Sequence, residues 1–473
     1  MAHVLSQVQR SVRRRRKPVA LTSTHVLRHP TGVSERVIQF KRINEQKATI
    51  ISRICSRSQG SYTSPTQVPH RPVDASMVTV NTIPTAILDD DERTIPILDV
   101  RTSALNDSGN PIRDQIVAGM STLGDKWPAA VLFDERGLKL YDAKVSQADG
   151  YYPFVAEMKI LHNHADDIAH AILSRGTPGS VGQDVIELGS GPMKKTALLL
   201  SAFARQISGT RPIPTTNYYA LDLDKRELIR TLGELGKSEV GPALKGKMST
   251  AGLWGTYDDG LRFIADGGLQ GSGKVPQDTE DSDSESDSTP VPKPSNPGQP
   301  LHMLFVGTSI SNFETRQEAS AFLRSLPLRP GSGDTLLLGM DQNDNVEEIE
   351  RAYNNPDGTS KEFLMNALVN AGRILGDESL FCQDGWEYVA HFNTSLRRFE
   401  YHFEALRALD IIDPMTGISY TFSKSDQILA HVSHKFSPGD ADKLFAEADL
   451  RPMDRWTDDS SKYTVWLLER PAA

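Results

Sequence analysis

The chain has 473 residues, of which 38% are hydrophobic and 7% aromatic, and this suits one large α/β domain with extensions. No apolar run is long enough to cross a membrane, and the two cysteines, Cys55 and Cys382, exclude a disulfide framework and a cysteine-based zinc site. The net charge of −9 argues against nucleic acid as the main partner.

The first segment, residues 1–75, is rich in arginine and serine and contains the basic run Arg13-Arg14-Arg15-Arg16-Lys17. This composition is typical of a mitochondrial transit segment or a localisation patch, and equally of a solvated extension. We expect a disordered extension on a cytoplasmic protein, with mitochondrial import as the alternative. Fusing this segment to a fluorescent protein would distinguish the two locations.

From about residue 95 the sequence becomes globular. An apolar stretch at 97–100 precedes expected helices over 112–119 and 156–173, and the pair Tyr151-Tyr152 lies between these helices. The second helix carries three histidines and two aspartates whose spacing places them on different helix faces. A metal site is therefore not expected.

A strand, a glycine turn and a helix follow. An apolar strand at 184–188 leads into Gly189, Gly191 and a leucine-rich helix, and a second strand at 217–223 carries Asp222 near its end. Glycines let a ligand approach the backbone, and an acid in this position is the usual partner of ribose hydroxyls. The third glycine of a dinucleotide fingerprint is absent, which disfavours a pyrophosphate. A ribose without a pyrophosphate suggests S-adenosylmethionine (SAM), although an ordinary strand-to-helix turn is the alternative.

The second half of the chain is interrupted by acidic and proline-rich residues, 272–300, which cannot bury a core. We expect a disordered loop within one domain. Apolar patterns predict further elements on both sides of it. They are an element that begins near 253, strands at 301–307, 336–340, 428–436 and 463–468, and a helix at 362–375.

Seven short segments stand in one order along the chain: Ile97-Leu98-Asp99-Val100-Arg101, Tyr151-Tyr152, Glu187-Leu188-Gly189-Ser190-Gly191, Tyr218-Tyr219-Ala220-Leu221-Asp222, Gly255-Thr256-Tyr257-Asp258-Asp259, Gly307-Thr308-Ser309-Ile310-Ser311-Asn312-Phe313 and Ala352-Tyr353-Asn354. As an ordered set they resemble the histidine-specific SAM-dependent methyltransferase family, which includes enzymes of ergothioneine and ergot alkaloid biosynthesis. The resemblance covers about residues 95–470, except the acidic loop.

The resemblance implies a set of cofactor-binding positions. They are Gly189, Gly191, Lys195, Asp222, Thr256, Tyr257 and Gly307. In the family, the loop that carries Lys195 approaches the methionine part of SAM, and the acid matched by Asp222 binds the ribose. Tyr257 falls where an aromatic packs by the adenine, with Thr256 in place of a frequent aspartate. The ordinary alternatives are a solvated Lys195 and a core aromatic at Tyr257.

The resemblance also implies substrate-binding positions. They are Tyr151, Tyr152, Asn312, Tyr353, Tyr401, His431 and Ser433. Asn312 and Tyr353 match the residues that hold the amino-acid head group, and we assign them the catalytic task of orienting the amine. Either Tyr151 or Tyr152 supplies the substrate-side aromatic. The alternatives are a helix cap at Asn312 and a core aromatic at Tyr152.

The sequence departs from the histidine-using members of the family near its C-terminus. Those members have a glutamate two residues before a serine, and this glutamate binds the substrate imidazole. Here His431 replaces the glutamate while Ser433 remains, and such a lost partner commonly costs about 1–3 kcal/mol. Tyr401 stands where those members carry a smaller aliphatic residue. Both changes favour a different side chain such as an indole, unless these are ordinary strand residues.

We therefore predict an α/β fold with a Rossmann-like SAM methyltransferase core at about 175–345 and a smaller α+β substrate-binding subdomain from about 95–170 and 345–470. The predicted function is SAM-dependent N-methylation of the α-amine of an aromatic amino acid, foremost a tryptophan derivative such as 4-dimethylallyltryptophan. Histidine methylation of the ergothioneine type and a non-catalytic SAM-binding relative are the alternatives. The expected partner is a small-molecule amino acid, without nucleic acid, membrane or metal, and the expected oligomeric state is a monomer or homodimer.

Overall fold

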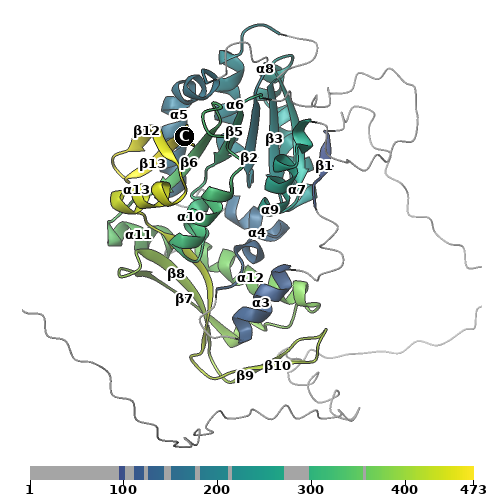
Figure 1. The fold of residues 1–473 in the computed structure, drawn as a ribbon. Coiled ribbons are helices and arrows are strands. Elements are labelled where there is room, and N and C mark those ends of the chain that lie inside the picture. Colours follow the sequence, from purple (N-terminus) through teal and green to yellow (C-terminus); the bar gives the residue numbers. More distant parts are fainter. Residues whose placement is uncertain are drawn as a thin grey trace, which may run out of the picture. The chain divides into compact units, whose positions relative to one another are not determined.

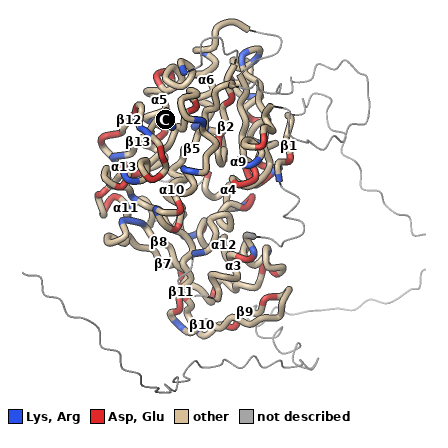
Figure 2. Tube along the Cα trace, in the orientation of Figure 1, with Lys and Arg blue, Asp and Glu red and all other residues tan. Residues whose placement is uncertain are grey.

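The computed structural model describes residues 95–101, 111–121, 126–142, 151–175, 182–210, 216–270, 298–354 and 358–472. The expected extension, 1–75, and residues 272–297 of the expected acidic loop lie outside this part of the chain. No helix within the described ranges combines the length and apolar character needed to span a membrane. Basic and acidic residues are interspersed along the described elements (Figure 2), unlike the basic stripe typical of nucleic-acid binding.

A mixed sheet organises the fold, and eight of the described strands form it (Figure 1). In spatial order they are β1 (Ile97–Asp99), β4 (Met248–Trp254), β3 (Thr216–Asp222), β2 (Asp184–Leu188), β5 (Leu301–Phe305), β6 (Thr335–Asp341), β13 (Tyr463–Glu469) and β12 (Arg451–Asp458). Strands β1 to β6 run parallel, whereas β13 and β12 are antiparallel additions. The strand order reverses between β2 and β5, and ligands bind at such switch points in α/β sheets.

Helices cover both faces of this sheet because its central strands are buried on both sides. Every residue of β2, β5 and β6 is buried. One apolar core joins the sheet to α5 (Tyr152–Leu173), α6 (Lys194–Gln206), α7 (Lys225–Lys237) and α8 (Val240–Leu244). A second core joins the other face to α9 (Tyr257–Ala265), α10 (Arg316–Ser325) and α13 (Pro438–Glu447). The short helix η3 (Gly268–Gln270) follows α9, and η4 (Ser309–Asn312) follows β5.

A smaller antiparallel sheet has its own apolar core. Its strands, in spatial order, are β11 (Gln427–His434), β8 (Arg398–Ala405) and β7 (Trp386–Asn393), and a separate hairpin consists of β9 (Leu409–Ile412) and β10 (Ser419–Phe422). The helices that contribute to this region are α3 (Pro111–Ser121), η1 (Ala129–Leu132), α4 (Glu135–Leu140), α11 (Val346–Tyr353), α12 (Thr359–Leu375) and η5 (Gln383–Gly385). In Figure 1 these elements lie at the end of the large sheet where its parallel strands terminate.

The predicted fold class, a Rossmann-like α/β sheet with a smaller antiparallel region, is confirmed. Helix α5 begins at Tyr152 and not near residue 156, because Pro153 lies in the first helical turn, where a missing N–H costs no helical hydrogen bond. Strands β1, β12 and β13 pair within the large sheet, although their residues fall in the ranges that we expected to form the substrate subdomain. The limits of that subdomain stay a prediction.

Candidate active site

The glycine turn after β2 lies against the ends of two neighbouring strands. The Gly189 N–H donates to the Leu221 carbonyl at 2.9 Å, and Gly189 has a φ of +70°, in the left-handed region. A Cβ atom at this position would lie 2.7 Å from the Tyr257 hydroxyl oxygen. The backbone conformation and the close contact therefore both require glycine here.

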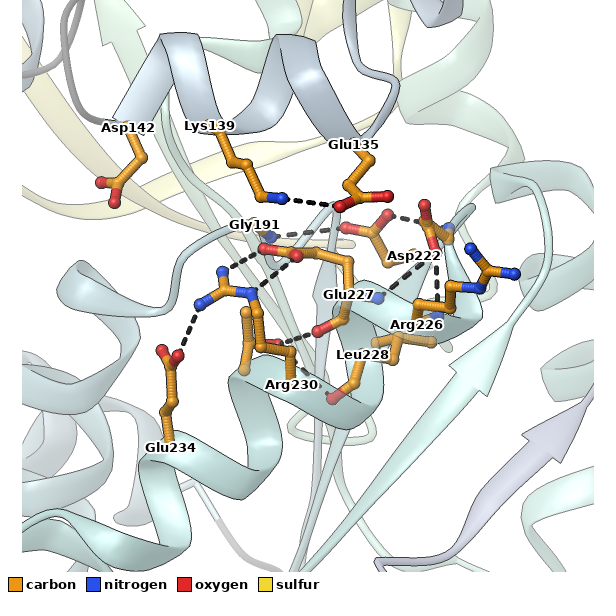
Figure 3. Close-up of polar contacts among 12 residues, drawn as sticks. Glu135, Lys139, Asp142, Gly191, Asp222, Arg226, Glu227, Leu228, Arg230 and Glu234 are labelled. Carbon is orange, nitrogen blue, oxygen red and sulfur yellow. Dashed lines mark hydrogen bonds and ion pairs between the residues drawn. The ribbon is translucent and has the colours of Figure 1, made fainter. Parts of the chain in front are cut away.

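The carboxylate of Asp222 lies beside the same turn at the end of β3 (Figure 3). It accepts hydrogen bonds from the backbone N–H groups of Gly191 at 3.4 Å and Asp224 at 3.3 Å. Burial raises the pKa of Asp222 above its ordinary value, while these backbone contacts oppose the increase. Asp224 also caps α7 by accepting from the Arg226 N–H at 2.8 Å, so the backbone around Asp222 is held in place.

Thr256 and Tyr257 begin α9, directly after β4. The Thr256 hydroxyl accepts from the Asp259 N–H at 3.1 Å, and the Thr256 backbone N–H donates to the Asp259 carboxylate at 3.1 Å, which forms a capping box. The Thr256 hydroxyl also donates to this carboxylate at 2.7 Å. The Tyr257 ring packs edge-to-face on Phe305 with the ring centroids 5.8 Å apart. Thr256 thus uses its hydroxyl in the helix cap, whereas Tyr257 is a half-buried aromatic that packs against the core and whose hydroxyl reaches the glycine turn.

A buried carboxylate joins two of the predicted cofactor positions. Glu157 of α5 is fully buried, forms an ion pair with Lys195 of α6, and accepts from the Gly307 N–H at 2.9 and 3.0 Å through its two oxygens. Gly307 follows β5 with a φ of +78°, and a Cβ atom there would lie 3.4 Å from Lys195 Nζ. Lys195 and Gly307 are therefore close neighbours, held together by a residue that sequence reasoning missed.

The predicted cofactor positions share one edge of the sheet. Gly189, Asp222, Thr256 and Gly307 follow the neighbouring parallel strands β2, β3, β4 and β5 respectively. An open cleft of about 500 Å³ borders the ends of β3 and β4. In Figure 3, α4 with its Lys139–Glu135 ion pair lies across from the start of α7 at this cleft. Its lining residues are Ile112, Ala130, Phe133, Glu135, Leu223, Asp224, Lys225, Arg226, Trp254, Asn370 and Ile374.

A second polar cluster contains two of the predicted substrate positions. Lys435 is fully buried, and its ammonium donates to Asp341 at 2.9 Å, to the Tyr353 hydroxyl at 2.8 Å and to the Ser433 hydroxyl at 3.1 Å. The two hydroxyl oxygens lie 3.1 Å apart. Burial lowers the pKa of Lys435, but the charge of Asp341 and the contact with Tyr353 more than reverse this effect. Lys435 therefore keeps its proton between these partners.

The two candidate tyrosines before Pro153 point to different partners. Tyr152 is buried and donates to Asp341 at 2.7 Å, so it belongs to the interior of the Lys435 cluster. The Tyr151 ring meets the Tyr353 ring edge-on, with the centroids 5.5 Å apart. Tyr151 is thus the one of the pair that extends the aromatic surface around Tyr353.

His431 and Tyr401 face each other on paired strands of the small sheet. Their rings are nearly parallel with centroids 6.0 Å apart, and the Tyr401 hydroxyl donates to the Tyr353 carbonyl at 3.4 Å. Burial lowers the pKa of His431 to about 3, and the charges of Lys126 and Lys435 add to this effect. His431 is therefore a neutral ring, and its buried Nδ1 has no hydrogen-bond partner among the described residues.

Asn312 ends η4 and is tied to the small sheet through Lys126. The Lys126 ammonium donates to the Asn312 carbonyl, and the Lys126 backbone forms a parallel bridge with Leu429 of β11. Burial lowers the pKa of Lys126 to about 8, although Glu314 and Glu318 oppose the decrease. Lys126 thus connects the predicted head-group residue with the strand that carries His431.

Four functional candidates escaped the sequence reasoning: Lys126, Glu157, Asp341 and Lys435. Lys435 has a weak signal, because it belongs to the serine-containing run that marked Ser433. Glu157 has none, because a glutamate in a long amphipathic helix is ordinarily solvated. Its burial follows from contacts with residues distant in the sequence, such as Gly307, 150 positions away, and Tyr463, 306 positions away.

Comparison with known families decides the identity of the fold and its chemistry. The model of the histidine-specific, SAM-dependent methyltransferases matches residues 112–470. The chain belongs to this family. As a member, it is a SAM-dependent methyltransferase, and the predictions of the family, the enzyme class and the cofactor are confirmed.

Three relatives illustrate the range of the family. The L-tryptophan methyltransferase of Psilocybe serbica is 36% identical over 79% of this chain and 97% of its own length. The 4-dimethylallyltryptophan N-methyltransferase of Claviceps fusiformis is 27% identical over 79% of this chain and 95% of its own length. Ergothioneine biosynthesis protein 1 of Schizosaccharomyces pombe is 28% identical over 72% of this chain, which spans only 39% of that protein.

The residues at the sheet edge fit SAM. Gly189 and Gly307 have positive φ angles, and a Cβ atom at either position would lie close to Tyr257 or Lys195, two of the predicted cofactor positions. The Lys195 ammonium suits a carboxylate, and the Asp222 carboxylate suits the hydroxyls of a ribose. The donor and acceptor set therefore matches both polar ends of this cofactor.

Proposed function

We propose that this protein transfers a methyl group from SAM to the α-amine of tryptophan or a ring-substituted tryptophan. The observation that carries the proposal is the neutral aromatic pair of Tyr401 and His431. By the family resemblance, His431 takes the place of a glutamate of histidine-using members, and Tyr401 takes the place of a smaller aliphatic residue. The similarity to the L-tryptophan methyltransferase of Psilocybe serbica supports the same substrate class.

In this proposal, the hydroxyls of Tyr353 and Ser433 bind the carboxylate of the amino acid. Each hydroxyl oxygen accepts a hydrogen bond from Lys435, so its own hydrogen must point elsewhere. One of them can donate to the other, which leaves at least one O–H for a ligand. A free donor beside a buried positive charge favours an anionic group, because charge-assisted hydrogen bonds are the strongest.

At the cofactor, Lys195 and the Gly189 turn would hold the methionine part of SAM, Asp222 the ribose, and Tyr257 the side of the adenine. When bound, SAM supplies a methyl group that its sulfonium charge already activates. The protein therefore needs to hold a neutral amine in line and close, and such positioning supplies most of the rate. No nucleophilic side chain is required for this chemistry.

Asn312 would orient the amine, since Lys126 fixes its backbone beside the small sheet. The oxygen of Tyr353 keeps a lone pair that Lys435 does not use, so it can accept a hydrogen bond from the amine N–H, and a water accepts the proton that the methylated amine loses. Asn312 and Tyr353 thus set the direction of attack, and the water removes the product's charge.

The side-chain end of the pocket would select an uncharged ring. A cationic imidazole would meet the field of two buried ammonium groups, Lys126 and Lys435, without the compensating glutamate. An indole carries no charge and can pack against Tyr401 and His431. This contrast favours tryptophan over histidine.

Calorimetric titration of the protein saturated with S-adenosylhomocysteine tests the proposal. Tryptophan should bind at least about tenfold more tightly than histidine, the equivalent of one lost polar contact. In the Asn312→Ala variant, tryptophan binding should weaken while the affinity for SAM stays within about twofold of the parent. Tighter binding of histidine than of tryptophan would contradict the proposed substrate preference. Loss of SAM binding in the Asn312→Ala variant would contradict the role proposed for Asn312.

A further inference from the structure

Both oxygens of Glu157, in the second turn of α5, accept hydrogen bonds. Its two oxygens accept from the Gly307 N–H at 2.9 and 3.0 Å, from the Tyr463 hydroxyl at 2.8 Å, and from Lys195. A Cβ atom at Gly339 of β6 would lie 2.2 Å from Glu157 Oε1, so the neighbouring strand leaves room for this carboxylate. No part of Glu157 reaches solvent.

These contacts exclude a direct role for Glu157 in holding a ligand. A carboxylate has about four lone-pair directions, and three donor groups occupy them, because the single Gly307 N–H is shared between both oxygens. Two of the groups that donate to Glu157 differ from it in position. Lys195 keeps 15% of its side chain exposed, whereas Glu157 is buried. Gly307 follows β5 at the sheet edge that also carries the Gly189 turn. Glu157 therefore acts on a ligand only through its neighbours.

We propose that Glu157 is a positioning residue for SAM, which fixes the Lys195 ammonium and the Gly307 backbone in one arrangement before the cofactor binds. The inference rests on the proposed placement of Lys195 and Gly307 at the cofactor. It assigns a function to a residue that no cofactor motif contains.

The charges around Lys195 support this role. Burial lowers the pKa of Lys195, but the charge of Glu157 and its hydrogen bond, together with Tyr141 and Glu187, more than reverse the effect, so the lysine stays protonated. The second nearby carboxylate, Glu187, is engaged with the hydroxyls of Thr196 at 2.7 Å and Tyr218 at 2.6 Å. Without the charge of Glu157, the ammonium would lose its ion-pair partner and its fixed direction.

The test compares SAM affinities measured by calorimetry in four full-length proteins. They are the parent, Glu157→Gln, Lys195→Met and the double variant. Glu157→Gln should weaken SAM binding at least about tenfold, the equivalent of one charge-assisted contact. In the Lys195→Met background, the same change should cost much less, because the lysine that transmits the effect is gone.

Tyr463→Phe is the matched control, since it removes one hydrogen bond to the same carboxylate and leaves the ion pair with Lys195 in place. It should lower the melting temperature and keep the affinity for SAM within about twofold of the parent. If Glu157→Gln does not fold, Glu157→Asp keeps the charge, withdraws it from Lys195, and should also weaken SAM binding.

Parent-like SAM affinity in the Glu157 variants would overturn the inference, as would an equal loss in the presence and absence of Lys195. None of these titrations contains an amino acid. If tryptophan proves not to be the substrate, these titrations would still give the same result. The two proposals can therefore be refuted independently of each other.

Discussion

Removing the hydroxyl of Tyr353 isolates the contribution of the Lys435 cluster to the reaction. Tyr353→Phe deletes the oxygen that accepts from the Lys435 ammonium at 2.8 Å and faces the Ser433 hydroxyl at 3.1 Å. The ring can keep its place, because it stacks on Phe399 with the centroids 5.1 Å apart. The change therefore removes polar contacts and leaves the aromatic packing.

The size of the effect follows from the contacts that remain. Lys435 retains its ion pair with Asp341 at 2.9 Å and its hydrogen bond to Ser433 at 3.1 Å. The buried charge thus stays paired, and the proposed loss at the substrate is the hydrogen bond from the Tyr353 hydroxyl to the charged carboxylate, about 1.5–3 kcal/mol. A loss of this size at the substrate lowers kcat/KM for tryptophan at least about tenfold.

Steady-state kinetics with tryptophan, together with calorimetry for SAM, measure the prediction. The affinity for SAM should stay within about twofold of the parent, because the contacts of Glu157 and Lys195 are separate. Tyr388→Phe is the control, since its hydroxyl donates to the backbone carbonyl of Tyr353 at 3.3 Å and the change leaves the Tyr353 hydroxyl in place. Unchanged kcat/KM in Tyr353→Phe, or an equal loss in both variants, would refute the reasoning.

Three further predictions concern other parts of the site. Gly189→Ala should weaken SAM binding, because an alanine in the left-handed conformation costs about 1–2 kcal/mol and its Cβ would lie 2.7 Å from the Tyr257 hydroxyl oxygen. A calorimetric SAM affinity equal to that of the parent would disprove this. His431→Glu should shift the kcat/KM ratio toward histidine by about 1–3 kcal/mol, and an unchanged ratio in a competition assay would argue against the assigned position. Burial lowers the pKa of Lys126 from 10.5 to about 8. Between these two pH values the unfolded chain therefore binds a proton that the folded chain has lost. As the pH rises through this interval, the free energy of unfolding of the parent should increase by up to about 3 kcal/mol because of this group. Lys126→Met should lack this gain in denaturant titrations, and parallel pH curves for the two proteins would contradict the buried charge.

The central strands could be predicted from the sequence because each is a continuous apolar run. The predicted strands at 301–307 and 336–340 correspond to β5 and β6, whose residues are all buried. Strands such as β12 and β9 are mostly exposed and carry no such pattern. Their conformation depends on pairing with neighbours, as β12 pairs with β13, and local sequence does not encode it strongly.

The glycine turn and its acid could be found because both are local motifs at strand ends. The residues that the sequence did not reveal act through distant partners: Glu157 meets Gly307 150 positions away, and Lys126 meets Asn312 186 positions away. From sequence alone, a charged side chain in a helix is expected to be exposed to solvent. Sequence motifs therefore indicated the groups proposed to contact the ligands, and only the structure revealed the buried residues that contact those groups.

The most direct test of the account is the product formed when the purified full-length protein receives SAM with an equimolar mixture of amino acids and indole derivatives. Mass spectrometry of the products is the readout, with fragmentation to locate the added methyl group. The account predicts that tryptophan or a ring-substituted tryptophan is methylated on the α-nitrogen ahead of histidine. Methylation of histidine in preference to every indole substrate would contradict the account.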